Sequence, residues 1–243
     1  RYRPHLLTEP EEKILAEKDV TSSSAWSRLF DELSSAIVIE LPEGPTSLEQ
    51  GLSRLGSPDR DDRRIAADAI TIALEPGLRT RAYVFNTLMA DKTTDDRLRS
   101  YSSWVASRNL ANQASDSSVQ ALVDAVVDRY DIPQRWYRLK AQLLGVDRIA
   151  DYDRNASIAS VEEKFSWSEA TDIVLDSYGS FSSELAGIVD TFINENWIDA
   201  PVRPGKRPGA FCAYTVPSAH PFLLLNWTSR RRDVLTLAHE LGH

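Results

Sequence analysis

The chain has 243 residues, enough for one large or two smaller domains with a substantial core. Its net charge of −8 argues against nonspecific nucleic-acid binding, which requires Lys and Arg to neutralise phosphates, and no stretch approaches 18 uninterrupted apolar residues, so no membrane span is expected. The single cysteine, Cys212, excludes an internal disulfide and fits a reducing compartment, so we expect a cytoplasmic protein.

Helical patterns fill the chain from residue 8 to about 199. Thr8 and Glu11 form a capping box with Pro10 just inside the helix start, and apolar residues then recur at i, i+3 and i+4 in several stripes. Ser166 and Glu169 form another capping box, ahead of two long helices expected at about 167–178 and 181–197. The sequence therefore predicts a mostly helical protein.

Residues 41–46 interrupt the helical pattern. The run Leu-Pro-Glu-Gly-Pro at 41–45 breaks any helix and marks a possible boundary inside the helical part. Thr46 and Glu49 look like a capping box that starts the next helix, and Gly56 is a plausible residue to end it.

The composition changes at residue 200. Residues 200–209 are rich in proline and glycine and predict a loop, and two short β-type runs follow at 210–216 and 222–227. Residues 217–221 connect the runs as a hairpin, in which 222–227 is almost continuously apolar and is expected to be the inner strand. We therefore divide the chain into a helical lobe, 1–199, and the start of a second domain, 200–243.

The last five residues, 239–243, read H-E-x-x-H on an apolar segment that Thr228 or Ser229 can cap, with Asp233 near its positive end. Residues four apart share one face of a helix, so His239 and His243 can bind the same ion, and two neutral imidazoles suit Zn²⁺. A carboxylate at Glu240 can contact a metal-activated water and act as general base.

A peptide-binding edge is expected beside this helix. An extended peptide can join an unpaired sheet edge through its main-chain groups, which gives binding that tolerates many sequences. We assign this role to residues 209–214, with Gly209, Ala210, Phe211, Cys212 and Tyr214 as the substrate-binding residues. Plain core sheet is the alternative for this strand.

Several stretches resemble oligoendopeptidase F, a branch of the thimet-oligopeptidase family of zinc metallopeptidases. They are residues 205–211 (GKRPGAF), 224–227 (LLNW) and 233–243 (DVLTLAHELGH), and the resemblance extends to 195–199 (ENWID) and 6–12 (LLTEPEE). It implies that the helices form one wall of a deep channel for unfolded oligopeptides, leading into a zincin-like catalytic domain. It also implies one Zn²⁺ on His239 and His243, with Glu240 as the base.

The resemblance also implies groups that this sequence does not contain. The family's third metal ligand is a Glu on the following helix, and downstream Tyr and His residues stabilise the tetrahedral intermediate. Arg1 is not an initiator Met and no signal-peptide pattern follows it, so we read the chain as an internal piece of a longer protein. We expect it to need the remainder of its own polypeptide, and to be inactive alone.

Two other functions remain open. A metallocarboxypeptidase of similar helical-channel architecture would need a basic pocket for a free carboxylate, for which Lys206 and Arg207 are the nearby candidates. A helical interaction scaffold would carry its terminal histidines incidentally. Cys212 could approach the metal as a thiolate, although a small packed residue is favoured, and His220 is expected to be an exposed loop side chain.

Overall fold

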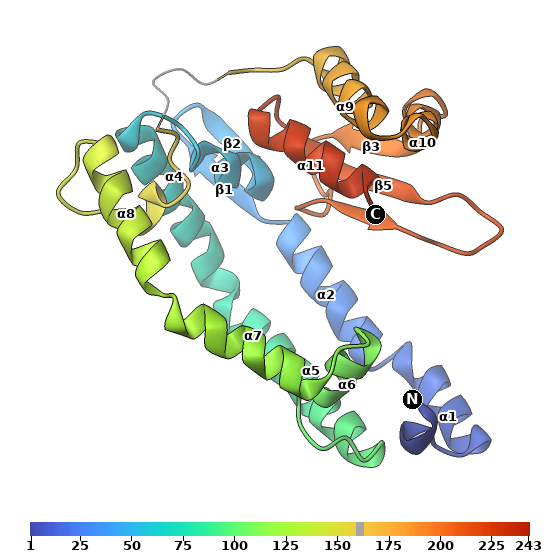
Figure 1. Cartoon of the computed structure of the whole chain (residues 1–243). Coiled ribbons are helices and arrows are strands. Elements are labelled where there is room, and N and C mark those ends of the chain that lie inside the picture. Colours follow the sequence, from blue (N-terminus) through green and yellow to red (C-terminus); the bar gives the residue numbers. More distant parts are fainter. Residues whose placement is uncertain (159–162) are drawn as a thin grey trace. The chain divides into compact units, whose positions relative to one another are not determined.

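The structure, a computed structural model, describes residues 1–158 and 163–243 and is mostly helical, as the sequence predicts (Figure 1). The chain forms two compact units, one made of residues 1–33 and 75–149 and the other of residues 34–74 and 150–243. None of the described helices is long and apolar enough to cross a membrane. The division at residue 200, which the composition indicates, stays a prediction.

The first unit is built from helices. Its elements are η1 (Arg3–His5), α1 (Glu9–Asp19), most of α2 (Ser23–Ser35), η2 (Glu75–Gly77), α5 (Leu78–Leu98), α6 (Ala106–Ala111), α7 (Asp116–Asp128) and α8 (Asp131–Leu143). The capping box that starts α1 is confirmed, since the Thr8 amide donates to the Glu11 carboxylate at 2.9 Å. Arg99 binds Glu12 at 2.7 Å and lowers the pKa of that carboxyl to about 2, so the end of α5 is joined to α1.

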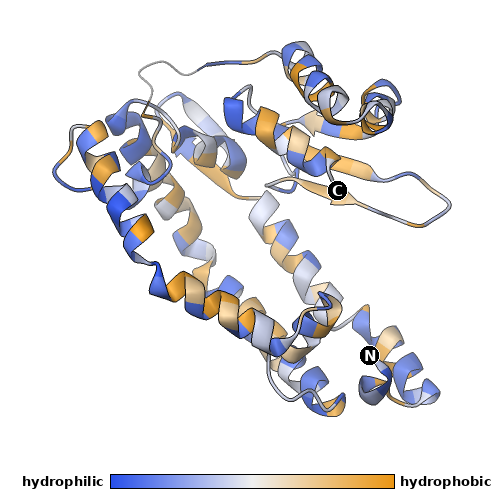
Figure 2. Cartoon of the chain, in the orientation of Figure 1, coloured by the Kyte–Doolittle hydropathy of each residue, from blue (hydrophilic) through white to orange (hydrophobic). Residues whose placement is uncertain are grey.

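Helix α7 leaves much of its apolar surface exposed. Leu122 is 65% exposed, and Val123, Val126 and Val127 are each close to half exposed. Hydrophobic residues are visible along this helix in Figure 2. Its side chains therefore contribute little to the packing of the first unit.

The second unit contains strands as well as helices. Its elements are β1 (Val38–Leu41), β2 (Gly44–Ser47), α3 (Leu48–Arg54), α4 (Arg60–Leu74), η3 (Asp151–Asp153), α9 (Trp167–Phe181), α10 (Ser183–Asn194), β3 (Ile198–Pro201), β4 (Phe211–Ala213), β5 (Phe222–Trp227) and α11 (Arg231–Leu241). The capping box of α9 is confirmed, with the Glu169 amide donating to Ser166 Oγ at 3.2 Å.

The interruption at 41–46 is a β-hairpin, which the sequence did not predict. β1 and β2 pair antiparallel from Val38↔Ser47 to Leu41↔Gly44, and Gly44 at φ +124° allows the tight turn. The expected capping box of Thr46 and Glu49 is wrong, because Ser47 caps α3 by accepting the Gln50 amide at 3.3 Å. This leaves the Glu49 carboxylate available for a distant partner.

A second sheet has the order β3-β5-β4. β4 and β5 form the expected antiparallel hairpin and β5 is the inner strand, as predicted. The loop predicted from residue 200 starts too early, because β3 continues to Pro201 and pairs parallel with β5. A proline is tolerated there because it lies at the end of an edge strand.

One core joins this sheet to three helices. Leu225 of β5 is buried against residues of α9, α10 and α11, which are Ala170, Val174, Val189, Val234 and Leu237. Burying a Val or Leu side chain contributes roughly 1.5–3 kcal/mol. This cluster therefore holds α11 on the sheet.

A buried ion pair fixes the segment at 150–155 to α4. Asp153, with a fully buried side chain, accepts from Arg63 Nη2 at 2.8 Å and Arg60 Nη2 at 3.0 Å. Burial raises the pKa of the Asp153 carboxyl, but its hydrogen bonds with the two arginines outweigh that effect and lower the pKa. The ionised carboxylate therefore stabilises the folded state. This contribution to stability is lost as the pH falls through the depressed pKa of Asp153.

We expect Asp153→Asn to lower the free energy of unfolding by about 3–5 kcal/mol, because it leaves buried Arg63 without its counter-charge. Chemical denaturation followed by circular dichroism measures this loss. Asp68→Asn, in the exposed pair with Arg64, is the control and should change stability by no more than about 0.5 kcal/mol. Equal stabilities of the two variants would contradict this account of Asp153.

Candidate active site

Helix α11 begins one or two residues later than expected. Arg230 is its N-cap, instead of Thr228 or Ser229. Asp233 Oδ2 accepts the amides of Thr228 at 2.7 Å and Arg230 at 3.0 Å, and also the Thr228 hydroxyl at 2.8 Å. The carboxylate thereby holds the turn that leads from β5 into the helix.

The residues of the H-E-x-x-H motif lie on different faces of α11. Val234 and Leu237 face the core, and Glu240 is buried with only 8% exposure. His239 and His243 are exposed. The packing of the apolar face therefore turns the carboxylate inward and leaves both imidazoles accessible.

Tyr178 of α9 holds the last turn of α11. Its hydroxyl donates to the Ala238 carbonyl at 2.7 Å, and burial raises the pKa of this phenol. The hydroxyl lies so near Gly242 that an added Cβ would come within 3.1 Å of it. Glycine at 242 thus permits the close approach of α9 to the motif.

The two imidazoles of the motif lie near each other. The ring centroids of His239 and His243 are 4.9 Å apart, and the rings are nearly perpendicular at 89°. Catalytic zinc usually takes three protein ligands. Within residues 1–158 and 163–243, no three His, Cys, Asp or Glu side chains gather at one point, so the metal site stays a prediction.

Strand β4 is at the edge of the sheet and has an open side among the strands that the structure describes. The Leu223 amide of β5 donates to the Trp197 carbonyl at 2.9 Å, on the β3 side. Because main-chain groups alternate along a strand, Phe222 and Leu224 face β4, where they oppose Ala213 and Phe211. The main-chain groups of Cys212 therefore point away from the sheet, to the free edge.

Cys212 lies close to the buried carboxylate. Burial raises the pKa of its thiol, and the negative charge of Glu240 raises it further. A raised pKa keeps the thiol neutral, which fits a small packed residue better than a thiolate ligand. Cys212 thus lies within electrostatic range of Glu240.

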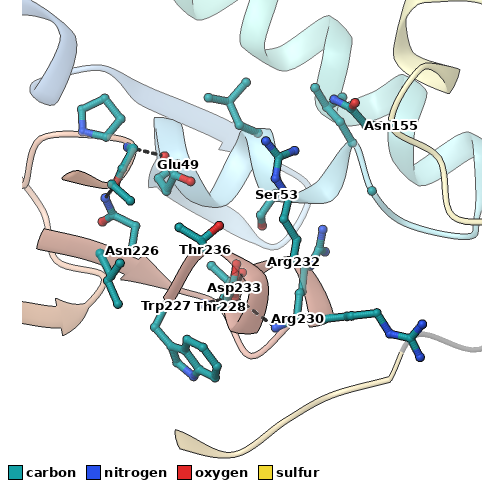
Figure 3. A pocket seen from close by; sticks show the side chains of 18 of the residues that line it. Glu49, Ser53, Asn155, Asn226, Trp227, Thr228, Arg230, Arg232, Asp233 and Thr236 are labelled. Atoms are coloured by element: carbon teal, nitrogen blue, oxygen red, sulfur yellow. Dashed lines mark hydrogen bonds between the residues drawn. The ribbon is translucent and has the colours of Figure 1, made fainter. Parts of the chain in front are cut away.

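The turn before β4 is held by hydrogen bonds to side chains of two other elements. Asn226, a buried residue of β5, donates to the carbonyls of Gly209 at 2.8 Å and Arg207 at 3.0 Å. Glu49 of α3 accepts the Gly209 amide at 3.1 Å (Figure 3). Gly209 has φ +86°, a conformation that favours glycine. Both main-chain groups of this glycine are therefore satisfied by side chains distant in sequence.

A cavity of about 910 Å³ lies beside this turn. Gly209, Ala210 and Glu240 line it. Glu49 and Asn226 line it as well, and both are labelled in Figure 3. The structure thus brings Gly209, Ala210 and Cys212 to the neighbourhood of Glu240. Sequence inspection missed Glu49 and Asn226, because a contact across 160 residues, as between Gly209 and Glu49, leaves no local signal.

The other predicted residues have more peripheral positions. The Tyr214 hydroxyl donates to the His243 carbonyl at 3.4 Å, and the Phe211 ring lies beneath the Arg207 guanidinium at 5.3 Å. His220 is not the exposed loop side chain that we expected, because its ring stacks on Trp197 at 3.7 Å.

Lys206 is not available as a basic pocket. Its side chain is only 5% exposed, and the ammonium donates to the carbonyls of Asp199 at 2.8 Å and Pro201 at 2.9 Å. Burial lowers the pKa of this ammonium, partly opposed by the Asp199 carboxylate. Lys206 therefore fastens the loop after β3.

The sequence pattern of peptidase family M3 matches residues 54–243, and that of oligopeptidase F matches residues 1–38. The chain belongs to peptidase family M3. It is 28% identical to group B oligopeptidase PepB of Streptococcus agalactiae over 99% of this chain and 41% of that protein. It is 26% identical to oligopeptidase PepF of Bacillus subtilis over 100% of this chain and 37% of that protein.

Solved structures share the fold of this M3 chain. A PZ peptidase A with an inhibitor matches at a TM-score of 0.79 and 19% identity, covering 91% of this chain and 40% of that one. An oligoendopeptidase F from Enterococcus faecium matches at 0.58 and 24% identity, covering 81% and 37%. The M3 chain spans about two fifths of the length of the curated relatives that it matches.

We expect Asn226→Leu to free the turn at 203–209, because it removes the side-chain donor to the Arg207 and Gly209 carbonyls, and each such hydrogen bond contributes about 0.5–1.5 kcal/mol. Trypsin should then cleave the chain after Lys206 about tenfold faster. Lys206 is the basic residue of this loop that is not followed by a proline. Asn194→Leu, at the exposed end of α10, is the control. Unchanged cleavage of the Asn226 variant would show that other contacts hold the turn.

Proposed function

We propose that this M3 chain is part of a zinc-dependent endopeptidase that hydrolyses short unfolded oligopeptides. The observation that carries the proposal is the position of Glu240, which is buried in a cavity wall beside the open edge of β4. His239 and His243 flank it on the exposed side of the same helix. Oligopeptidases among the relatives support the substrate class.

His239 and His243 would hold the zinc, since paired imidazole nitrogens one helical turn apart suit this ion. When bound, zinc supplies Lewis-acid polarisation of the scissile carbonyl. The third ligand belongs, in this proposal, to a later part of the full-length polypeptide. The chain alone is therefore expected to bind zinc poorly and to cleave no peptide.

Glu240 is the general base. A carboxylate oxygen accepts a proton from the water that attacks the scissile carbonyl. The hydrogen bond from Tyr178 to the Ala238 carbonyl holds the helical turn that carries Glu240. The position of the Glu240 carboxylate is therefore fixed. Because the carboxylate is buried in a cavity wall, few water molecules other than the attacking one can hydrogen-bond to it.

The open edge of β4 binds the substrate main chain. The amide and carbonyl of Cys212 face outward, so an extended peptide can pair with them as an added strand. Such pairing makes few demands on side chains, which suits an enzyme that degrades varied peptides. The clamp on Gly209 fixes where this edge begins.

Of the two cations named for the carboxypeptidase alternative, Lys206 is buried and bound to main-chain carbonyls, and Arg207 lies over the Phe211 ring at 5.3 Å. The helical scaffold alternative predicts no zinc in the full-length polypeptide and no effect of changing Glu240. Digestion of blocked and free-ended peptides separates the two peptidase classes.

In the full-length polypeptide, Glu240→Gln should leave zinc bound and lower kcat by about 10²–10⁴-fold, the usual contribution of a positioned base. Elemental analysis measures the zinc, and a quenched fluorescent oligopeptide measures turnover. Glu17→Gln, an exposed carboxylate of α1, is the control. Near-normal turnover by a zinc-loaded Gln variant would remove Glu240 from the mechanism.

Ala210→Pro should raise KM for oligopeptides by about tenfold or more, because proline removes a main-chain donor and fixes φ where the edge begins. Ala210→Ser keeps the amide and should behave like the wild type. Circular dichroism shows whether the variants fold. Unchanged kinetics in a folded proline variant would place the substrate strand elsewhere.

A further inference from the structure

Tyr178 of α9 contacts the two residues of α11 that come directly before the histidines of the motif. Helix α9 lies beside α11 in the second unit (Figure 1). The Tyr178 hydroxyl donates to the carbonyl of Ala238, which precedes His239, at 2.7 Å. A Cβ added to Gly242, which precedes His243, would lie 3.1 Å from the same oxygen. One hydroxyl therefore lies against both ends of the turn that carries the two imidazoles.

The Ala238 carbonyl uses this hydroxyl as a partner because α11 tightens at its end. The Gly242 amide donates to the His239 carbonyl, three residues back, at 3.0 Å, instead of to the Ala238 carbonyl four residues back. Carbonyls in the last turn of a helix need partners from outside the regular pattern. Tyr178 supplies that partner for Ala238.

The ring of Tyr178 is held by the core of the second unit. It packs against the buried cluster that joins α9, α10 and α11 to β5, as do Ala238 and Leu241. Burial raises the pKa of the phenol, so the hydroxyl stays protonated and can donate at neutral pH. Tyr178 does not line the cavity beside Glu240, so it acts on the site through the main chain of α11.

The separation of the imidazoles depends on the shape of this turn. The ring centroids of His239 and His243 lie 4.9 Å apart, and both side chains are exposed, so their positions follow the main chain that carries them. Groups that orient metal-binding histidines typically change metal affinity about 10–100-fold when they are mutated. A turn that is already held next to both histidines loses less freedom when an ion binds.

We propose that Tyr178 is a positioning residue for the zinc site: its hydroxyl fixes the last turn of α11 and thereby sets the zinc affinity of His239 and His243. This proposal rests on the zinc peptidase function proposed above. It gives a role in that function to α9, a helix that carries no residue of the motif. Removal of the hydroxyl weakens zinc binding and leaves peptide binding unchanged.

The test uses the full-length polypeptide and measures the zinc Kd by competition with a chromophoric chelator. Tyr178→Phe removes the hydroxyl and keeps the ring in the core, and Tyr130→Phe, at an exposed tyrosine, is the matched control. We expect the zinc Kd to rise about tenfold in Tyr178→Phe and to stay unchanged in Tyr130→Phe. At saturating zinc, KM for a quenched fluorescent oligopeptide should equal that of the wild type, which a general loss of structure would not allow.

Gly242→Ala tests the close approach from the side of α11. The new Cβ would lie 3.1 Å from the Tyr178 hydroxyl and 3.2 Å from the His239 carbonyl, and Tyr178→Phe removes only the first of these contacts. We expect Gly242→Ala to raise the zinc Kd about tenfold in the wild type and less than about threefold in the Tyr178→Phe background, because substitutions that share a contact do not act independently.

Amide hydrogen exchange over residues 238–243 measures the turn directly. It should be faster in Tyr178→Phe than in Tyr130→Phe, because the Phe variant no longer holds the Ala238 carbonyl. Unchanged exchange would show that the hydroxyl does not hold the turn.

Equal zinc Kd values for the Tyr178 and Tyr130 variants would overturn the positioning role and leave the peptidase function intact. So would effects of Gly242→Ala and Tyr178→Phe that simply multiply. A wild-type protein that binds no zinc would refute the proposed function, and the positioning role with it.

Discussion

Everything about the site depends on the burial of one face of α11 against β5 and α9. Val234 and Leu237 pack with Leu225 in the core, and that packing fixes the rotation of the helix. Once the rotation is fixed, Glu240 must face inward and His239 and His243 must face outward, because an α-helix turns 100° per residue. The orientation of the motif's side chains thus follows from hydrophobic packing up to two turns earlier in the helix.

The edge of β4 is defined by which of its main-chain groups are already satisfied. One side of the strand pairs with β5, and the turn before it is held by Asn226 and Glu49, so both main-chain groups of Gly209 already have a hydrogen-bond partner. In the proposed function, a peptide would therefore pair with the outward groups that follow. Two polar side chains would then set the limits of the peptide site without contacting the peptide.

Sequence inspection predicted the features whose signals lie within a few residues and missed the contacts between segments that are distant in sequence. The capping boxes at Thr8 and Ser166 and the inner strand at 222–227 were predictable, because their signals lie within a few residues. The hairpin at 38–47 was missed because Pro45 and Gly44 look like helix breakers, although the turn and edge positions tolerate them. The partners of Gly209 come from segments 17 and 160 residues away and could not be inferred from spacing.

The discontinuous second unit has a consequence for biosynthesis. Residues 34–74 contain β1, β2, α3 and α4, but their partners at 150–243 leave the ribosome only after residues 75–149 have been added. At about 5–20 residues per second, that interval lasts on the order of ten seconds. During it, Ile39 has α3 and α4 as neighbours, while Arg63 has no Asp153 to neutralise it. The chain must therefore keep a partly formed unit out of aggregates while the other half is synthesised.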